Sequence, residues 1–193
     1  MNLPPRILLI FLGAVALHGT SFADDNAARL LLQAGNGELE GIKSSDGSKM
    51  PSASQWVKDP EKAKRTVAVI QPLTADGWTT FSITFKATEA TSVKLRISGD
   101  FNKAGETWAL FDNVKAEGAE IVNGDFETSA QGVPSGWMLQ KTEGKQGELL
   151  TDGKAAASGE KYIKVSHTYP AVQMIQVPAN QEVTITASAR LAP

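Results

Sequence analysis

The chain has 193 residues, of which 41% are hydrophobic and 21% are charged, and its formal net charge at pH 7 is −2. A charge so close to zero argues against a nucleic-acid partner, because phosphate binding calls for a strongly basic surface. The chain has no cysteine. No disulfide can stabilise the fold, so stability has to come from the burial of apolar side chains.

The first 23 residues have the pattern of a secretory signal peptide. Arg6 supplies a positive charge, residues 7–17 form an apolar run, and Ser21-Phe22-Ala23 has small residues at the two positions that signal peptidase reads. The apolar run is too short to span a bilayer. We therefore expect cleavage after Ala23, a secreted, periplasmic or cell-surface location, and no membrane insertion afterwards. An uncleaved anchor is the alternative.

The remaining chain is dominated by the alternation of apolar and polar residues that is typical of half-buried strands. The clearest alternation covers residues 81–87, 93–98, 163–166 and 182–189. Shorter strands are expected over residues 67–70, 109–115 and 172–177. The only helical candidate of note is the Ala- and Leu-rich segment 27–33. Many short strands separated by turn-forming pairs such as Asp152-Gly153 predict an all-β protein with an antiparallel β-sandwich (jelly roll) fold.

A pentapeptide is repeated along the chain. Asn36-Gly37-Glu38-Leu39-Glu40 returns as Asn123-Gly124-Asp125-Phe126-Glu127, and each copy is followed by a Pro-Ser turn and a tryptophan, Trp56 or Trp137. Such a repeat indicates two related modules. We expect a shortened module over residues 24–119 and a second one over 120–193 that lacks its closing strands. The alternative is one composite sandwich over residues 65–193.

The order of these motifs resembles that of carbohydrate-binding modules of the family 4/9 type, which are galactose-binding-like jelly rolls. Gly136-Trp137, Gln173 and the motif at 123–127 are similar to the first half of that pattern, and Trp78-Thr79-Thr80-Phe81 and Phe111-Asp112-Asn113-Val114 to the second half. The resemblance implies sugar binding on an open sheet face. It also implies a structural Ca²⁺, held by Asp112 with Glu40 or Glu127, because this ion takes oxygen ligands from several segments. The alternative is that these carboxylates are solvated turn residues or backbone caps.

Aromatic residues are the main candidates for sugar contact, because sugar rings pack their apolar C–H faces on flat side chains. Trp78 and Tyr162 share the parity of the polar residues on their strands, so we expect both to face outward. Trp108 is compatible with a buried or an outward position. Including polar partners and the two repeat tryptophans, the predicted sugar-binding residues are Trp78, Tyr162, Trp137, Trp56, Arg96 and Gln173. For Trp56 and Trp137, packing against the sandwich edge is the competing interpretation.

The sequence after the leader has no recognisable catalytic pattern. It has no cysteine nucleophile and no Gly-x-Ser-x-Gly turn, and His167 has the parity of the apolar residues Ile163 and Val165. We therefore expect a secreted, non-catalytic protein that holds polysaccharide or glycoconjugate by aromatic stacking and hydrogen bonds. The alternatives are an adhesive β-sandwich that binds protein partners and a binding appendage of a glycoside hydrolase.

Overall fold

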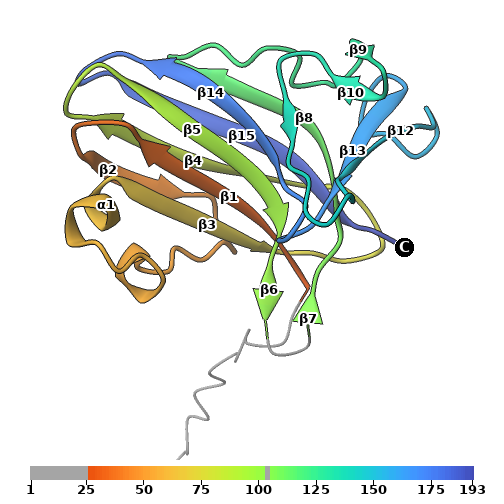
Figure 1. Cartoon of the computed structure of the whole chain (residues 1–193), viewed down its shortest axis with the longest axis horizontal. Helices are drawn as coiled ribbons and strands as arrows, with labels where there is room; N and C mark the ends of the chain where they lie inside the picture. Colours follow the sequence, from red (N-terminus) through yellow and green to blue (C-terminus); the bar gives the residue numbers. More distant parts are fainter. Residues whose placement is uncertain (1–25, 103–104) are drawn as a thin grey trace, which may run out of the picture.

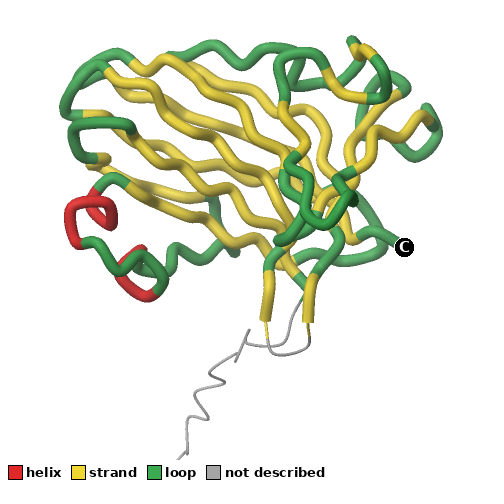
Figure 2. Tube along the Cα trace, in the orientation of Figure 1, coloured by secondary structure: helices red, strands yellow, loops and turns green. Residues whose placement is uncertain are grey.

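The computed structural model of the chain describes residues 26–102 and 105–193. They form two antiparallel β-sheets packed face to face (Figure 1), so the predicted all-β sandwich is confirmed. Strands and loops make up most of the described chain, and its helical turns lie together on one side (Figure 2). The predicted signal peptide lies outside the described residues. Within them, no helix is long and apolar enough to cross a membrane.

One sheet has five strands and the other has six. In spatial order, the five-stranded sheet consists of β11 (Met138–Leu139), β14 (Ala171–Val177), β5 (Thr91–Gly99), β1 (Ala27–Ala34) and β3 (Thr66–Pro72). The six-stranded sheet consists of β12 (Glu148–Thr151), β13 (Lys161–Val165), β8 (Ala109–Glu117), β15 (Glu182–Leu191), β4 (Thr79–Ala87) and β2 (Leu39–Ser44).

The other elements are short. Two small hairpins are formed by β6 (Phe101–Asn102) with β7 (Gly105–Glu106) and by β9 (Ser129–Ala130) with β10 (Val133–Pro134). A 3-10 turn, η2 (Ala53–Gln55), and the helix α1 (Pro60–Lys64) lie between β2 and β3 in the chain. Asp59 caps α1 by accepting hydrogen bonds from the backbone N–H groups of Glu61 and Lys62.

The core fills the space between the two sheets. Leu30 and Ile97 from the five-stranded sheet and Phe85 and Ile185 from the six-stranded sheet are all 0% exposed. Their neighbours along each strand point to the outer faces, which is the arrangement that the period of two predicts. The strands expected over 67–70, 81–87, 93–98, 109–115, 163–166, 172–177 and 182–189 correspond to β3, β4, β5, β8, β13, β14 and β15.

The helix predicted over residues 27–33 is wrong, because this segment is the strand β1. Ala and Leu favour helix in isolation, but so short a helix is marginal without tertiary packing. As a strand, the segment pairs with β3 on one side and β5 on the other. It also places Ala28, Leu30 and Leu32 in the core, each 0% exposed. Burial and pairing on both edges outweigh the intrinsic propensity.

The two sheets do not divide at residue 119. Strand β14 pairs with β5, and β15 lies between β4 and β8, so strands from the two halves of the chain alternate within each sheet. The described chain therefore forms one sandwich, where two modules over 24–119 and 120–193 were expected. The composite over residues 65–193 is also too short, because β1 and β2 precede it and belong to the two sheets.

Candidate functional site

The outer face of the six-stranded sheet has a line of contacting side chains that we call the aromatic row. It contains the aromatic residues Trp78, Tyr162, Trp108 and Tyr169, joined by Arg190, Leu110 and Lys164. Tyr162 and Lys164 on β13 alternate with the core residues Ile163 and Val165. This alternation turns the row away from the core.

At one end of the row, Trp78 meets Tyr162 edge to face. Their ring centroids are 6.0 Å apart and the ring planes make an angle of 82°. The Trp78 Nε1–H donates to the carbonyl oxygen of Ala155 at 3.0 Å, and the Arg190 Cζ atom lies 5.2 Å from the Trp78 ring centroid. Trp78 is partly exposed, whereas Tyr162 is buried at 6% exposure. Tyr162 faces outward as predicted, but because it is buried there it orients Trp78 and offers little contact surface of its own.

At the other end, Trp108 stacks on Tyr169. The two ring centroids are 5.6 Å apart, the ring planes make an angle of 17°, and both residues are partly exposed. The Lys164 Nζ atom lies 5.2 Å from the Trp108 ring centroid, which is within reach of a cation–π interaction. Tyr169 comes from the loop between β13 and β14 and not from a strand. This end supplies two adjoining flat rings with an ammonium group beside them.

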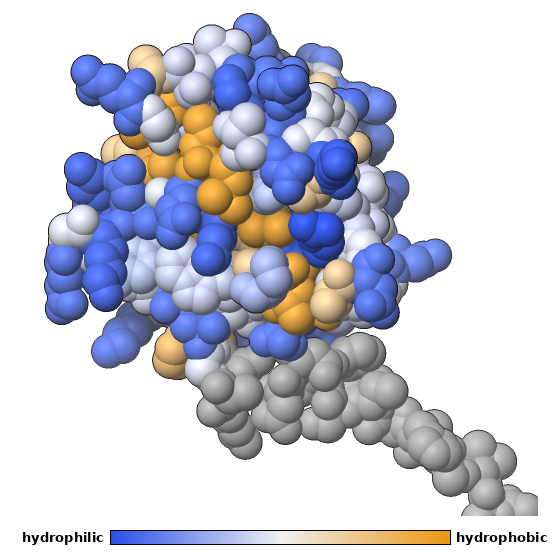
Figure 3. Space-filling model, turned by 90° about the vertical axis from the view of Figure 1, so that its right-hand side faces the viewer, coloured by the Kyte–Doolittle hydropathy of each residue, from blue (hydrophilic) through white to orange (hydrophobic). Residues whose placement is uncertain are grey.

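Strand pairing connects the two ends. Leu110 on β8 lies directly opposite Lys164 on β13 and opposite Arg190 on β15. Although Leu110 is on the outer face, it is only 1% exposed. Apolar surface beneath two cationic side chains therefore separates the two tryptophans. On the side of the molecule shown in Figure 3, apolar side chains likewise form a band between hydrophilic groups.

Trp137 and Gln173, both predicted to contact sugar, have structural roles in this fold. Trp137 is 5% exposed, and its Nε1–H donates to the carbonyl oxygens of Val122 and Asn123, each at 3.1 Å. The Gln173 amide accepts from the N–H of Val122 at 2.9 Å and donates to the carbonyl oxygens of Val122 and Gly136. These bonds fasten the second copy of the repeated motif to the five-stranded sheet. They use the polar groups of both side chains.

Trp56 and Arg96 lie on the outer face of the five-stranded sheet, across the sandwich from the aromatic row. The Arg29 Cζ atom is 5.1 Å from the Trp56 ring centroid. Arg96, on β5, donates through Nη2 to the carbonyl oxygen of His167. The six predicted sugar-binding residues are thus distributed over two opposite faces and the core.

Asp112, one of the predicted metal ligands, is 0% exposed and accepts three backbone hydrogen bonds. Its Oδ1 accepts from Asn113 N at 2.6 Å, and its Oδ2 accepts from Ala157 N and Ser158 N, both at 2.9 Å. Burial raises the pKa of this carboxyl, and the three hydrogen bonds offset part of that effect. Asp112 thereby holds the loop before β13 against β8.

Glu127, from the segment before β9, binds the other end of the loop that precedes β13. Its Oε1 accepts from Glu160 N at 2.7 Å and from Lys161 N at 2.8 Å, and these hydrogen bonds lower the pKa of the Glu127 carboxyl. Lys161 Nζ also donates to the Glu127 carbonyl oxygen at 2.6 Å. The acidic residues of the two motifs therefore bind backbone N–H groups of one loop.

The residues present do not fit the implied calcium site. Five backbone N–H groups already point at the carboxylates of Asp112 and Glu127, whereas Ca²⁺ takes about six to eight oxygen ligands. Glu40 is exposed on the edge strand β2, which β4 and β15 separate from β8. The described part of the chain contains no group of three or more His, Cys, Asp or Glu residues placed to hold a metal ion.

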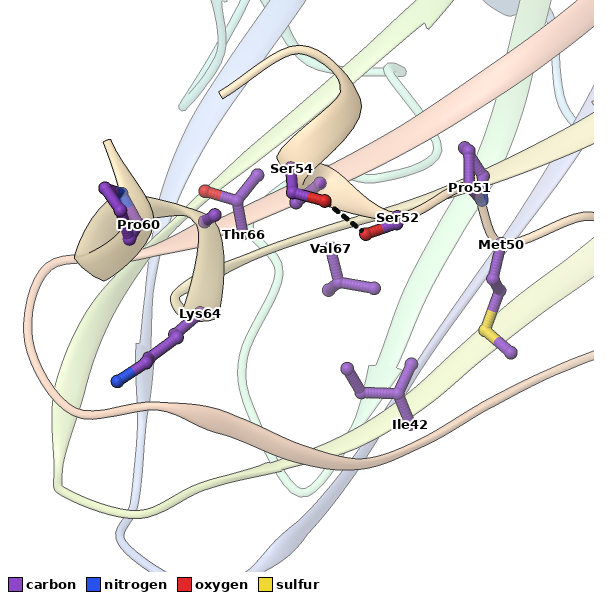
Figure 4. Close-up of a pocket in the computed structure, with 11 residues that line it drawn as sticks. Ile42, Met50, Pro51, Ser52, Ser54, Pro60, Lys64, Thr66 and Val67 are labelled. Atoms are coloured by element: carbon purple, nitrogen blue, oxygen red, sulfur yellow. Dashed lines mark hydrogen bonds between the residues drawn. The ribbon is translucent and has the colours of Figure 1, made fainter. Parts of the chain in front are cut away.

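A groove of about 510 Å³ lies between α1, η2 and the adjoining strands β2 and β3 (Figure 4). Its lining includes the apolar residues Ile42, Met50 and Val67, and no aromatic ring. The polar groups on its rim already have partners: the hydroxyls of Ser52 and Ser54 are 2.8 Å apart, and Lys64 forms ion pairs with Glu61 and Glu38. The groove has little of the chemistry that sugar binding needs.

No family model, curated protein or solved structure matches this chain. The sandwich is the part of the predicted resemblance that the structure confirms. Of the aromatic row, Trp78 and Tyr162 were predicted from the sequence, Trp108 was compatible with either position, and Tyr169 was not predicted. The parity of Lys164 relative to the apolar residues of β13 was an available signal for the end at Trp108.

Proposed function

We propose that this protein is a non-catalytic carbohydrate-binding protein that holds glycan chains on its aromatic row. The observation that carries the proposal is the pair of partly exposed tryptophans, Trp78 and Trp108, at the two ends of one continuous outer surface. Each tryptophan is held in place by a second aromatic ring. Flat rings fixed in this way suit the apolar faces of pyranose rings.

Polar groups for the sugar hydroxyls are available beside both rings. Arg190 and Lys164 carry cationic donors at Trp78 and Trp108, respectively. Farther along the same face, the hydroxyl pair Thr80 and Ser188 is 3.1 Å apart on β4 and β15. A ligand that stacks on the rings and donates to or accepts from these groups combines the two interactions that the proposal requires.

We propose that the aromatic row binds glycans without hydrolysing them. The row consists of Trp, Tyr, Arg, Lys and Leu side chains, and none of these carries a carboxyl group. Glycoside hydrolysis requires, in most families, a pair of carboxyl groups flanking the scissile bond, and the row supplies no such pair. Together with the predicted leader, this chemistry supports a role outside the cytoplasm, where the protein would hold polysaccharide or glycoconjugate. A binding appendage of a glycoside hydrolase would use the same surface.

Adhesion to a protein partner is the second candidate function, and a separate apolar surface favours it. Met138 on β11 and Met174 on β14 are 55% and 57% exposed. Val172 lies opposite Met138 and two residues from Met174, but it is 3% exposed, so the two methionines supply the exposed apolar surface. Exposed apolar surface of this kind is typical of protein contacts.

Affinity electrophoresis of residues 24–193 through gels containing neutral polysaccharides tests the proposed function. We expect retardation by at least one polysaccharide, and loss of that retardation in Trp108→Ala but not in Trp56→Ala, which changes a tryptophan on the opposite face. If the protein migrates equally in gels with and without each polysaccharide, this would count against carbohydrate binding and favour adhesion. If only Trp56→Ala loses the retardation, the sugar-binding site lies on the five-stranded sheet and not on the aromatic row.

A further inference from the structure

A set of buried polar atoms on the outer face of the five-stranded sheet makes no hydrogen bond within the protein, although one of them, Arg29 Nε, lies 3.4 Å from Asp100 Oδ1. Five buried side-chain nitrogen or oxygen atoms in the described residues make no hydrogen bond within the protein. Four of them belong to residues gathered on this face: Arg29 Nε, Trp56 Nε1, Ser98 Oγ and His167 Nδ1. Unpartnered buried polar groups are rare in proteins and are usually explained by a role or a bound species.

Strand register brings the members of this set together. Arg29 on β1 lies directly opposite Ser98 on β5, and Arg96 is two residues from Ser98 on the same outward face. Ile97, between Arg96 and Ser98, is in the core, so the direction of both side chains is fixed. The Trp56 ring packs on the Arg29 guanidinium.

The loop after β13 completes the set through His167. Its carbonyl oxygen accepts from the Arg96 guanidinium, and its imidazole ring centroid is 5.8 Å from that of Phe101, which is 60% exposed. Arg96 and His167 are themselves partly exposed. Solvent therefore reaches the side chains of Arg96 and His167, and a small group could approach the buried donors from there.

Two guanidinium groups, those of Arg29 and Arg96, lie on this face, and one carboxylate pairs with one of them. Asp100 Oδ1 lies 3.4 Å from Arg29 Nε, so one carboxylate pairs with one of the two guanidinium groups. The nearby Glu106 carboxylate is engaged elsewhere, because its Oε1 accepts from the Ser166 hydroxyl and from Thr168 N. Burial, and to a smaller extent the charge of Arg29, lowers the pKa of Arg96.

We infer that Arg29, Arg96, Ser98 and Trp56 form a binding site for an oxyanion, a carboxylate or sulfate group. The inference does not depend on the aromatic row. Two guanidinium groups, a hydroxyl and an indole N–H are all hydrogen-bond donors, and guanidinium groups match the two oxygens of a carboxylate or sulfate. An acidic sugar residue and free inorganic sulfate both carry this chemistry.

A titration at constant ionic strength separates these two sources. Residues 24–193 are titrated with sodium sulfate, with sodium glucuronate, and with glucose as the neutral control, while NaCl keeps the ionic strength constant. The melting temperature and the NMR shift of the Trp56 indole N–H are followed. Saturable responses to sulfate or to glucuronate, with none to glucose, are expected. A response to glucuronate alone identifies an acidic sugar, and a response to sulfate alone identifies a sulfate group. Absence of both would overturn the site.

Variants locate the response. Arg96→Gln should lower the affinity for the responding anion roughly tenfold, because it removes a charged donor. Ser98→Ala should lower this affinity less, because it removes a neutral hydroxyl. Lys94→Gln is the matched control, since it removes a positive charge two residues before Arg96 on the same outward face of β5. Because Ser98→Ala removes one hydroxyl only, it keeps the test valid if Arg96→Gln does not fold. Equal losses in Lys94→Gln and Arg96→Gln, or an unchanged affinity in Ser98→Ala, would contradict the assignment.

Discussion

The Arg190 guanidinium packs over the indole ring of Trp78, with 5.2 Å between Cζ and the ring centroid. The two residues come from opposite halves of the chain. They meet because β15 lies directly beside β4 in the six-stranded sheet. The surface proposed to bind sugar therefore needs strands from both halves of the chain.

Fragments of the chain should therefore fail to fold. Residues 120–193 contain β13, β14 and β15, but the partner strands β4, β5 and β8 all lie earlier in the chain. Expressed alone, this fragment would expose unpaired edges and core side chains, and we expect aggregation. Residues 65–193 should also be poorly soluble, because they lack β1, which lies between β5 and β3. Size-exclusion chromatography of both fragments beside 24–193 checks this, and a monomeric, folded fragment would contradict the single sandwich.

Replacement by alanine should destabilise the protein much more at Trp137 than at Trp108. Trp137→Ala removes a buried side chain that packs on Phe126 and should lower the free energy of unfolding by about 3–5 kcal/mol. Trp108→Ala removes a partly exposed ring, so the loss of stability should be smaller, on the order of 1 kcal/mol. Urea unfolding of the two variants measures both values. Equal destabilisation would show that Trp108 is a core residue and not a platform.

Gln173→Ala should destabilise the protein although little apolar surface is lost. The substitution removes the three hydrogen bonds that the amide makes with Val122 and Gly136. Because these bonds are partly buried, we expect their loss to lower the free energy of unfolding by about 1–3 kcal/mol. Urea unfolding gives the loss, and Gln176→Ala on the exposed side of β14 is the control. If both variants are equally stable, Gln173 does not fasten the motif.

Calcium should not change the melting temperature. The carboxylates of Asp112 and Glu127 are stabilised by backbone N–H donors, so the fold does not depend on an ion at this position. Melting curves of 24–193 with added Ca²⁺ and with EDTA are expected to coincide. A rise with Ca²⁺ that Glu127→Gln abolishes would instead establish the calcium site that the resemblance implies, because ligand binding to the folded state raises stability.

The stability of the protein should fall as the pH drops below about 6.5, the usual pKa of histidine. Burial, together with the nearby charges of Arg96 and Arg29, lowers the pKa of His167, and Asp100 and Glu106 only partly oppose this. The unfolded chain then binds a proton that the folded chain resists, so acidification favours unfolding. Urea unfolding of 24–193 from pH 7.5 to 5.5 should show this loss. His167→Gln should show a flatter profile, and identical profiles would refute this source of the pH dependence.

The sequence predicted the sandwich well because alternation reports directly which side of a strand is buried. It failed for β1, where Ala and Leu suit either conformation and only the strands on both sides decide. For Trp137 it left sugar contact and packing against the sandwich edge both open, and for Gln173 it did not reveal the structural role. Trp137 donates to the carbonyl oxygen of Val122, and Gln173 donates to that of Gly136. Parity does not reveal such partners, because they come from other segments of the chain. The row itself could be only half predicted, because Tyr169 reaches Trp108 from a loop.

The most direct test of the proposed binding surface is calorimetric titration of 24–193 with an oligosaccharide of a retarding neutral polysaccharide. We predict that Trp78→Ala and Trp108→Ala each weaken binding by about 1–3 kcal/mol, as loss of an aromatic platform does. Trp56→Ala, on the opposite face, should bind as the wild type does. Unchanged affinity in both row variants, with folding verified by circular dichroism, would contradict the assignment of the row as the glycan-binding surface.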